Sequence, residues 1–322
     1  SQAILDKATN VSVMGIDLDI ESLLVAKRRL QKHSSRTIFA NMNFAELDII
    51  TNDHSVLDED YTSLGGTTTY GAALAQKLNY QPAIVTSMKR EDLPKNSLPG
   101  IPIHIAESTN TTSFVNIYNS EGVRKQKLID IATKIKPSDI PKEWIKTPVV
   151  LLGPLANEVD YSCTRIFSDS IVVATIQGWL RQWDSKGMTS IPKGWDGTEV
   201  LPFVDAAIVS EHDFENLENF EKWKTLVNIL VLTQGENGAT IFHSGKKIHI
   251  PGWETDAVDP TGAGDVFAAA FSLSYSKSSN VEYAGRFASC AASFSVQGVG
   301  FESMPTQKQV ESRMNQHPNG RQ

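Results

Sequence analysis

The stretch Asp259–Phe267, which reads D-P-T-G-A-G-D-V-F, constrains the fold more than any other part of the chain. Pro260 and two glycines end a preceding strand, and the alanine-rich run that follows favours a helix. A helix that begins here presents unpaired backbone N–H groups and the positive end of its dipole. Gly262, Ala263 and Gly264 place little side chain in the way of an anion that approaches those groups. The sequence therefore predicts a phosphate-binding turn at a helix N-terminus.

Asp265 follows that turn directly. A carboxylate at the rim of a phosphate site can accept the proton of a hydroxyl that attacks a phosphoryl group. The structural alternative is that Asp265 caps a core helix and that the glycines only permit a turn. The spacing by itself leaves both interpretations open.

The string D-P-T-G-A-G-D before a small, apolar helix resembles the C-terminal signature of the ribokinase-like (PfkB) family of carbohydrate kinases. The resemblance implies an α/β fold, namely a ribokinase-like three-layer sandwich with a mostly parallel central sheet and a small β lid. It also implies that Asp265 is the catalytic base and that Gly262, Ala263 and Gly264 form the anion hole for the migrating phosphate. ATP and Mg²⁺ are the implied cofactors.

Composition excludes several other classes of protein. The chain has 322 residues, a net charge of −7 and no basic run beyond 27–29, which gives no reason to expect nucleic acid as a partner. No apolar stretch reaches the length of a membrane span, so no membrane partner is expected. Cys163 and Cys290 are too few and too far apart for a disulfide framework. These features fit a cytoplasmic protein.

The first segment differs from the rest. Residues 11–17 read as a strand, 20–31 as an amphipathic helix and 37–40 as a second strand. Residues 15–19 look like a piece of a Rossmann-type methyltransferase, but the glycine-rich loop that should precede them is absent. We therefore expect an N-terminal extension over 1–35 and a kinase domain over 36–322.

Residues 43–70 contain the residues expected to bind the substrate that receives the phosphate. Gly65 and Gly66 precede an alanine-rich helix and resemble the family signature G-G-x-x-x-N-x-A, with Tyr70 in place of asparagine. Asp48 lies where the family carries an acidic residue that grips substrate hydroxyls, although Asn43 stands where the family has glycine. The resemblance implies substrate binding by Asp48, Gly65 and Gly66, and a surface aspartate is the structural alternative for Asp48.

Alternating polar and apolar residues predict half-exposed strands at 101–105, 111–118 and 124–128. Such alternation is typical of an antiparallel flap. In the family these pieces, with a strand near 61–63, form a lid, so we expect lid strands within about 47–66 and 101–130. A homodimer through this lid is a further expectation.

Continuous apolar runs at 149–154, 171–176 and 204–209 predict buried parallel strands. Ligands collect beyond the carboxyl ends of such strands, which places Gly153, Gln177 and Arg181 near the site. By resemblance Arg181 binds substrate, and a surface ion pair is the alternative.

Two further pieces concern metal and nucleotide. Asp213, with Glu211 beside it, occupies the place of a family element that orders the Mg²⁺ shell; the alternative is a capping box for a helix that begins at Asp213. The run 233–238 matches a T-x-G-x-x-G element that lines the ATP phosphates, although alone it reads as a β-turn. The nucleotide-binding residues expected from this resemblance are Thr233, Gly235, Gly238 and Thr261.

The resemblance implies a kinase that transfers the γ-phosphate of ATP to a hydroxyl of a small sugar or polyol. Residues 65–70, 111–114 and 177–184 look closest to an inositol-kinase-like branch, which suggests myo-inositol. One alternative is a nucleoside kinase of the same fold. Another is a catalytically silent sugar-binding relative, because Asn43, Tyr70 and Ser210 depart from the family pattern.

Overall fold

The computed structural model describes residues 36–40, 46–50, 65–93, 98–118, 124–190, 194–214, 217–301 and 303–316. Of 36–40, 46–50, 116–118 and 124–125 it describes the backbone alone. The chain divides into residues 1–34 and residues 35–322, and everything described here lies in the second unit. The extension expected over 1–35, the strand near 61–63 and Asn43 lie outside the described residues.

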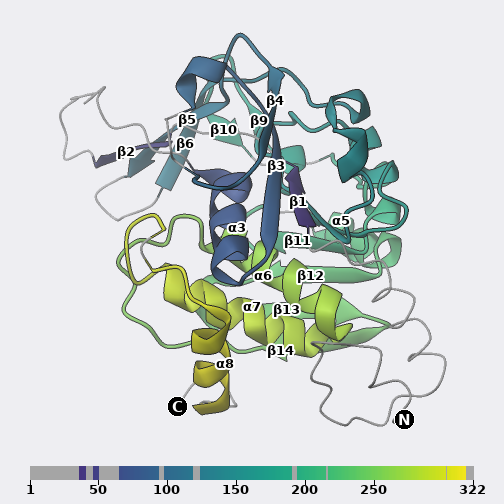
Figure 1. Ribbon diagram of the computed structural model, residues 1–322, viewed down its shortest axis with the longest axis vertical. Coiled ribbons are helices and arrows are strands. Elements are labelled where there is room, and N and C mark those ends of the chain that lie inside the picture. The colour runs from purple at the N-terminus through teal and green to yellow at the C-terminus, as the bar shows by residue number, and fades with distance from the viewer. Residues whose placement is uncertain are drawn as a thin grey trace. The chain divides into compact units, whose positions relative to one another are not determined.

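A nine-stranded sheet forms the centre of the unit, in the order β14-β13-β12-β11-β8-β7-β1-β3-β4 (Figure 1). The strands from β12 to β4 are parallel to their neighbours, and β13 and β14 continue antiparallel from β12. This is the mostly parallel sheet that the sequence predicted. The strands are β1 Arg36–Ala40, β3 Gln81–Met88, β4 Ile103–Glu107, β7 Val149–Leu152, β8 Ile171–Thr175, β11 Ala206–Ser210, β12 Ile229–Thr233, β13 Ala239–His243 and β14 Lys246–Ile250.

The central strands are apolar on both faces because helices cover both. Leu151 faces one hydrophobic cluster while its neighbours Val150 and Leu152 face the other. Successive side chains of a strand point to opposite faces, so a strand between two layers needs a continuous apolar run. The α/β sandwich with two buried sheet faces is thereby confirmed.

The helices divide between these two clusters. On one side α3, α6, α7 and α8 share a cluster with alternate strand residues, and α6 packs against both α3 and α7 (Figure 1). On the other side α5 contributes Phe220 and Trp223. The helices are α3 Gly66–Lys77, α4 Gln177–Leu180, α5 Leu217–Leu226, α6 Ala263–Ser278, α7 Val281–Ser295 and α8 Gln307–Gln316.

A separate three-stranded sheet corresponds to the expected lid. It has the order β2-β5-β6, with β2 Glu46–Ile50 parallel to β5 Ser113–Tyr118, and β5 antiparallel to β6 Arg124–Asp130. A two-stranded piece, β9 Gln182–Trp183 with β10 Thr189–Ser190, lies beside β6. The closing movement of this sheet stays a prediction.

Two expectations need correction. The strand expected in the lid at 101–105 is β4, which pairs parallel with β3 at the end of the central sheet. An edge strand has one open side and therefore shows the same alternation as a flap strand. The helix expected to begin at Asp213 begins at Leu217, and Asp213 instead closes the turn after β11.

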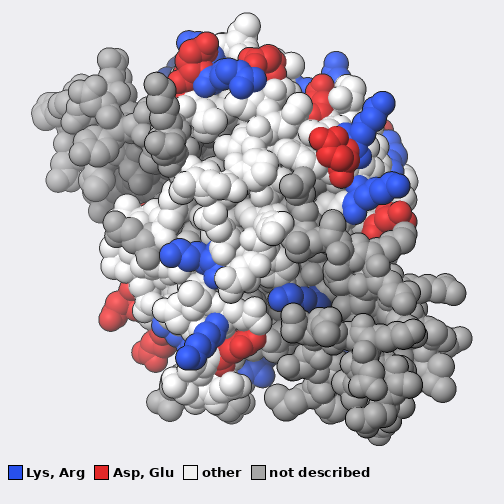
Figure 2. Space-filling view, in the orientation of Figure 1, with Lys and Arg blue, Asp and Glu red and all other residues white. Residues whose placement is uncertain are grey.

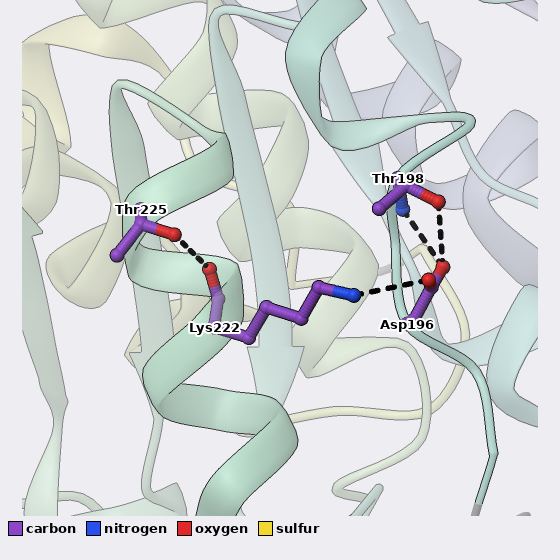
Figure 3. A network of polar contacts seen from close by, with 4 residues as sticks. All are labelled: Asp196, Thr198, Lys222 and Thr225. Carbon is purple, nitrogen blue, oxygen red and sulfur yellow. Dashed lines mark hydrogen bonds and ion pairs between the residues drawn. The ribbon is translucent and has the colours of Figure 1, made fainter.

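Polar contacts fasten α5 to the loop before residues 201–203. Asp196 accepts hydrogen bonds from the backbone N–H of Thr198 at 3.0 Å and from the Thr198 hydroxyl at 2.8 Å (Figure 3). It also forms an ion pair with Lys222 at 3.0 Å. These contacts lower the pKa of Asp196 to about 2, and the two hydrogen bonds from Thr198 are the largest cause.

On the face in Figure 2, charged side chains of both signs are interspersed around an uncharged centre.

The described residues contain no membrane-spanning helix, and both of their cysteines are reduced. Within them, every helix is too short or too polar to cross a bilayer. Cys163 and Cys290 are buried free thiols, and burial raises the pKa of each to about 12.

Candidate functional site

A cavity of about 200 Å³ opens where the carboxyl ends of the parallel strands meet the N-termini of α3 and α6. Thr175, Ser210 and Thr233 end β8, β11 and β12 and line its floor. This is the place at which open α/β sheets bind ligands. The other lining residues are Gly66, Thr67, Tyr70, Phe114, Gln126, Leu155, Gln177, Arg181, Ile208, Val209, Asp213, Pro260, Thr261, Gly262, Gly264 and Asp265.

The turn before α6 has the shape that the sequence predicted. The carboxylate of Asp259 accepts a hydrogen bond from the N–H of Thr261 at 2.9 Å, which folds the chain back before the helix. Gly262 is the N-cap, with a φ of 77° that favours glycine. A Cβ added at Gly264 would meet no atom within 4 Å, so open space lies against the first helical turn. The first-turn N–H groups of a helix lack intrahelical acceptors, which makes this space suitable for an anion.

Asp265 occupies the first turn of α6 and lines the cavity. The hydroxyl of Thr67, from the first turn of α3, donates a hydrogen bond of 2.5 Å to its Oδ1. The N-termini of two helices that are 198 residues apart in sequence thus meet at this carboxylate.

Arg181 is 8% exposed and holds the cavity wall together. Its guanidinium donates to the carbonyl of Leu155 at 3.0 Å and to Oε1 of Gln126 at 2.9 Å, and it lies 4.7 Å from the ring centroid of Phe114. Gln126 and Phe114 come from the lid sheet, whereas Leu155 follows β7. Arg181 therefore connects the lid to the central sheet.

The buried carboxylate of Glu158 holds the backbone of Leu155, whose carbonyl accepts from Arg181. Glu158 is 1% exposed and accepts hydrogen bonds from the N–H groups of Leu155, at 2.8 Å, and Ala156. Burial raises the pKa of Glu158, and those N–H groups together with the charge of Arg181 act in the opposite direction.

Asp213 lines the cavity from the turn after β11. Its Oδ1 accepts from Gln177 at 2.7 Å and its Oδ2 from the N–H of Ser210 at 2.9 Å. Burial raises the pKa of Asp213, against the effect of these two bonds. Each carboxylate oxygen retains lone pairs, so Asp213 can still accept from water in the shell of a cation. Among the described residues, no three His, Cys, Asp or Glu gather to ligate a metal directly.

The turn between β12 and β13 packs tightly against the end of β14 and the residues after it. Gly238 has a φ of 87°, and a Cβ there would come within 2.2 Å of the carbonyl oxygen of Ile250. A Cβ at Gly252 would come within 1.9 Å of the carbonyl oxygen of Glu236. Gly238 is therefore required by packing, whatever else it does.

The cavity brings together most of the predicted site residues. Those that line it are Asp265, Gly262, Gly264, Thr261, Gly66, Arg181, Asp213 and Thr233. Four others are outside its lining: Ala263 and Gly65 adjoin lining residues, and Gly235 and Gly238 lie in the turn after β12. Glu211 is exposed and also outside the lining. Asp48 lies in β2, in register with Asn116 of β5, and its side chain is outside the described residues.

Sequence reasoning missed two residues that hold others in place. Thr67 contacts Asp265, and Gln126 contacts Arg181. The position of Thr67 directly after Gly65–Gly66 was a usable signal, because a helix that starts at a site aims its first turn into it. Gln126 lies in a lid strand and carried no comparable signal.

Comparison with known proteins supports the same family. Residues 188–308 match the pfkB family of carbohydrate kinases. A nucleoside kinase of Methanocaldococcus jannaschii is 35% identical over 126 residues, which are 37% of this chain and 42% of that protein. The chain spans less than half the length of the first curated relatives it matches.

Solved structures agree in fold over most of both chains. A pyrophosphate-dependent kinase in the ribokinase family, complexed with a pyrophosphate analog and myo-inositol, has a TM-score of 0.68 at 20% identity and covers 86% of this chain and 99% of its own. Arabidopsis thaliana ribokinase, complexed with ribose and ATP, has a TM-score of 0.64 at 21% identity and covers 86% and 97%. Residues 188–308 therefore match the pfkB family of carbohydrate kinases, and the chain shares the ribokinase-like fold of these solved structures.

Proposed function

We propose that this protein is a kinase that transfers the terminal phosphoryl group of ATP to a hydroxyl of a small sugar or polyol. One observation carries the proposal: Asp265 lines a cavity beside a glycine turn that opens α6, with free space at Gly264. The same turn thus offers a proton acceptor and an anion site within one cavity. Similarity to named ribokinases and nucleoside kinases supports this reading.

The residues suggest how the transfer proceeds. The acceptor hydroxyl gives its proton to the carboxylate of Asp265, and its oxygen forms a bond to the γ-phosphorus of ATP. The bond from that phosphorus to the bridging oxygen breaks, and ADP leaves. The N–H groups of the first turn of α6 stabilise the charge that spreads over the transferred oxygens.

The proposed reaction also uses Mg²⁺, which this site would hold through water molecules of its coordination shell. Asp213 would hold the ion through water, because its two oxygens already accept one bond each from Gln177 and Ser210. Bound there, the ion would offset negative charge on the phosphate groups of the nucleotide. Glu211, exposed and outside the cavity lining, is the weaker candidate.

The lining of the cavity suits a polyhydroxylated acceptor. Hydroxyl and amide side chains make up much of the cavity lining, and each can donate to or accept from a sugar hydroxyl. They belong to Thr67, Thr175, Ser210, Thr233, Gln126 and Gln177. The solved neighbour that holds myo-inositol supports inclusion of that polyol among the acceptors.

Exposed apolar side chains beside the turn favour a nucleotide over pyrophosphate as donor. Val258 is 65% exposed and Val299 63% exposed. The N–H of Val258 donates to the carbonyl of Val296 at 2.7 Å, so the two loops lie side by side. An adenine ring would cover apolar surface that pyrophosphate would leave in water.

A coupled assay of ADP release tests the proposal. The acceptors are myo-inositol, ribose, fructose and adenosine, with ATP as donor, and a parallel phosphate-transfer assay uses pyrophosphate. Asp265→Asn should bind a non-hydrolysable ATP analogue in calorimetry as wild type does, while turnover falls by about 10²- to 10⁴-fold. Full activity in Asp265→Asn would overturn the assignment of the base. Binding of acceptor and nucleotide without turnover in wild type would indicate a silent relative.

Nucleoside kinase is the second candidate, favoured by the 35% identity to the archaeal nucleoside kinase. Adenosine in the panel separates the two. A kcat/KM for adenosine above that for every sugar and polyol would replace the first candidate by the second.

A further inference from the structure

The hydroxyl of Thr67 contacts the carboxylate of the proposed base directly. Thr67 is 1% exposed, lies in the first turn of α3 and donates from Oγ1 to Oδ1 of Asp265 at 2.5 Å. A hydrogen bond to a charged acceptor is shorter and stronger than one between neutral groups. This contact is independent of the glycine turn that supplies the anion site.

Thr67 is itself held in place from the opposite side. Gly153, which follows β7, faces its side chain, and a Cβ added at Gly153 would come within 2.4 Å of both Cβ and Oγ1 of Thr67. A threonine in a helix has few χ1 positions open to it. The missing side chain at Gly153 thus makes the space in which the hydroxyl of Thr67 reaches Asp265.

We propose that Thr67 is the positioning residue of the phosphoryl-transfer site. Its hydroxyl occupies Oδ1 of Asp265 and fixes the rotation of the carboxylate, so that Oδ2 faces the acceptor hydroxyl. The inference rests on the proposed function, since it assigns Asp265 the role of base. Thr67 thereby couples the helix start that binds the acceptor to the helix start that binds the phosphate.

Removal of the donor has two expected effects. A carboxylate that has lost this bond rotates more freely, and in part of its rotations neither oxygen faces the acceptor, so kcat falls while the KM values for ATP and acceptor change little. The hydrogen bond also favours the ionised carboxylate, so its loss shifts the acid limb of kcat/KM to higher pH. The other ionisable groups that line the cavity are Arg181, Asp213 and Tyr70, and all remain in the variant.

Three variants and one control test this. Thr67→Val removes the donor at nearly constant shape, and we expect kcat to fall about 10- to 100-fold, the range for loss of a hydrogen bond to a charged group. Thr67→Ser keeps the donor and should retain most of kcat. Gly153→Ala keeps Thr67 but pushes its side chain, and should lower kcat as Thr67→Val does. Thr69→Val is the control, since Thr69 is also 1% exposed on α3 but lies outside the cavity lining.

Two results would overturn the inference: unchanged kcat in Thr67→Val, or a lower kcat with an unmoved acid limb. Equal losses in Thr67→Val and Thr69→Val would do the same, because they would report general packing of α3. If Thr67→Val fails to fold, Gly153→Ala and Thr67→Ser decide between the outcomes.

A measurement without turnover separates this inference from the proposed function. The ¹³C resonance of the Asp265 carboxyl, assigned by its absence in Asp265→Asn, should titrate at higher pH in Thr67→Val than in wild type. That shift tests the hydrogen bond whether or not Asp265 acts as base. An active Asp265→Asn would refute the function, and an unshifted titration would refute the role of Thr67.

Discussion

The ring of Tyr70 lies directly against Gly262, so close that a Cβ at Gly262 would come within 2.5 Å of its Cε1. Tyr70 is 5% exposed and packs edge-on against Phe301 at a centroid distance of 5.3 Å, so it has little freedom to move. The residue that departs from the family signature therefore supports the turn that carries the proposed anion hole.

Gly262→Ala should lose both stability and activity. The left-handed φ of 77° costs a residue with a Cβ about 1–2 kcal/mol, and the clash with Tyr70 adds to this. Gly264→Ala is the matched control for stability, because its Cβ meets nothing within 4 Å. It should melt like wild type or higher and still lose turnover, since its methyl group enters the space assigned to phosphate. Thermal melts and the ADP-release assay give both readouts, and a fully active Gly264→Ala would contradict the anion site.

Arg181→Met should raise the KM for the acceptor more than the KM for ATP. The change leaves the carbonyl of Leu155 and the amide of Gln126 without their donor, and loosens the lid sheet from the central sheet. Loss of one partner of a buried hydrogen bond costs about 1–3 kcal/mol, so the urea midpoint should also fall. Arg165→Met is the control: Arg165 lies 4.3 Å from the ring centroid of Phe203 and donates to a backbone carbonyl, but outside the cavity. Equal changes in both KM values would argue against a role at the acceptor.

Asp213→Asn should raise the Mg²⁺ concentration needed for half-maximal turnover, with the fold retained. The amide of Gln177 can rotate to accept from the new Asn amide, so the local hydrogen bonds survive while the negative charge is lost. Glu211→Gln removes a neighbouring charge outside the cavity lining and should leave the Mg²⁺ dependence unchanged. The opposite order of the two effects would assign the metal shell to Glu211.

Asp196→Asn should lower stability in a way that depends on pH. The pKa of Asp196 is lowered from 3.8 to about 2 in the folded protein, chiefly by the two bonds from Thr198. A lowered acid pKa contributes stability above the unfolded value, and this contribution disappears as pH falls toward the folded value. The difference in unfolding free energy between wild type and variant should therefore be constant above about pH 5 and shrink as pH falls from about 4 to 2. Urea unfolding across that range checks it, and a pH-independent difference would contradict it.

Thr198→Ala and Lys222→Met divide that effect. Thr198→Ala removes the hydroxyl bond but keeps the backbone N–H bond, which is the largest cause of the lowered pKa, so it should reproduce only part of the Asp196→Asn difference. The Lys222 contribution should decrease with added salt, since both partners are half exposed.

Much of the fold followed from local patterns. Continuous apolar runs marked β7, β8 and β11 correctly, because a strand between two helical layers buries both faces. The glycine turns marked the starts of α3 and α6. The pattern failed for β4, where an edge strand and a flap strand share the same alternation, and at Asp213, where a turn resembles a helix cap.

The sequence by itself determined the glycine turn at 259–265, the helix after it and the acid at its rim, because these depend on neighbours in the chain. Tertiary structure alone decided that Thr67 meets Asp265, that Arg181 joins lid to sheet, and that Tyr70 fills the space left by Gly262. Those contacts link residues far apart in the chain, and their geometry depends on how whole helices and strands pack. Local propensity carries no record of that packing, so the pairs could be found only in the folded protein.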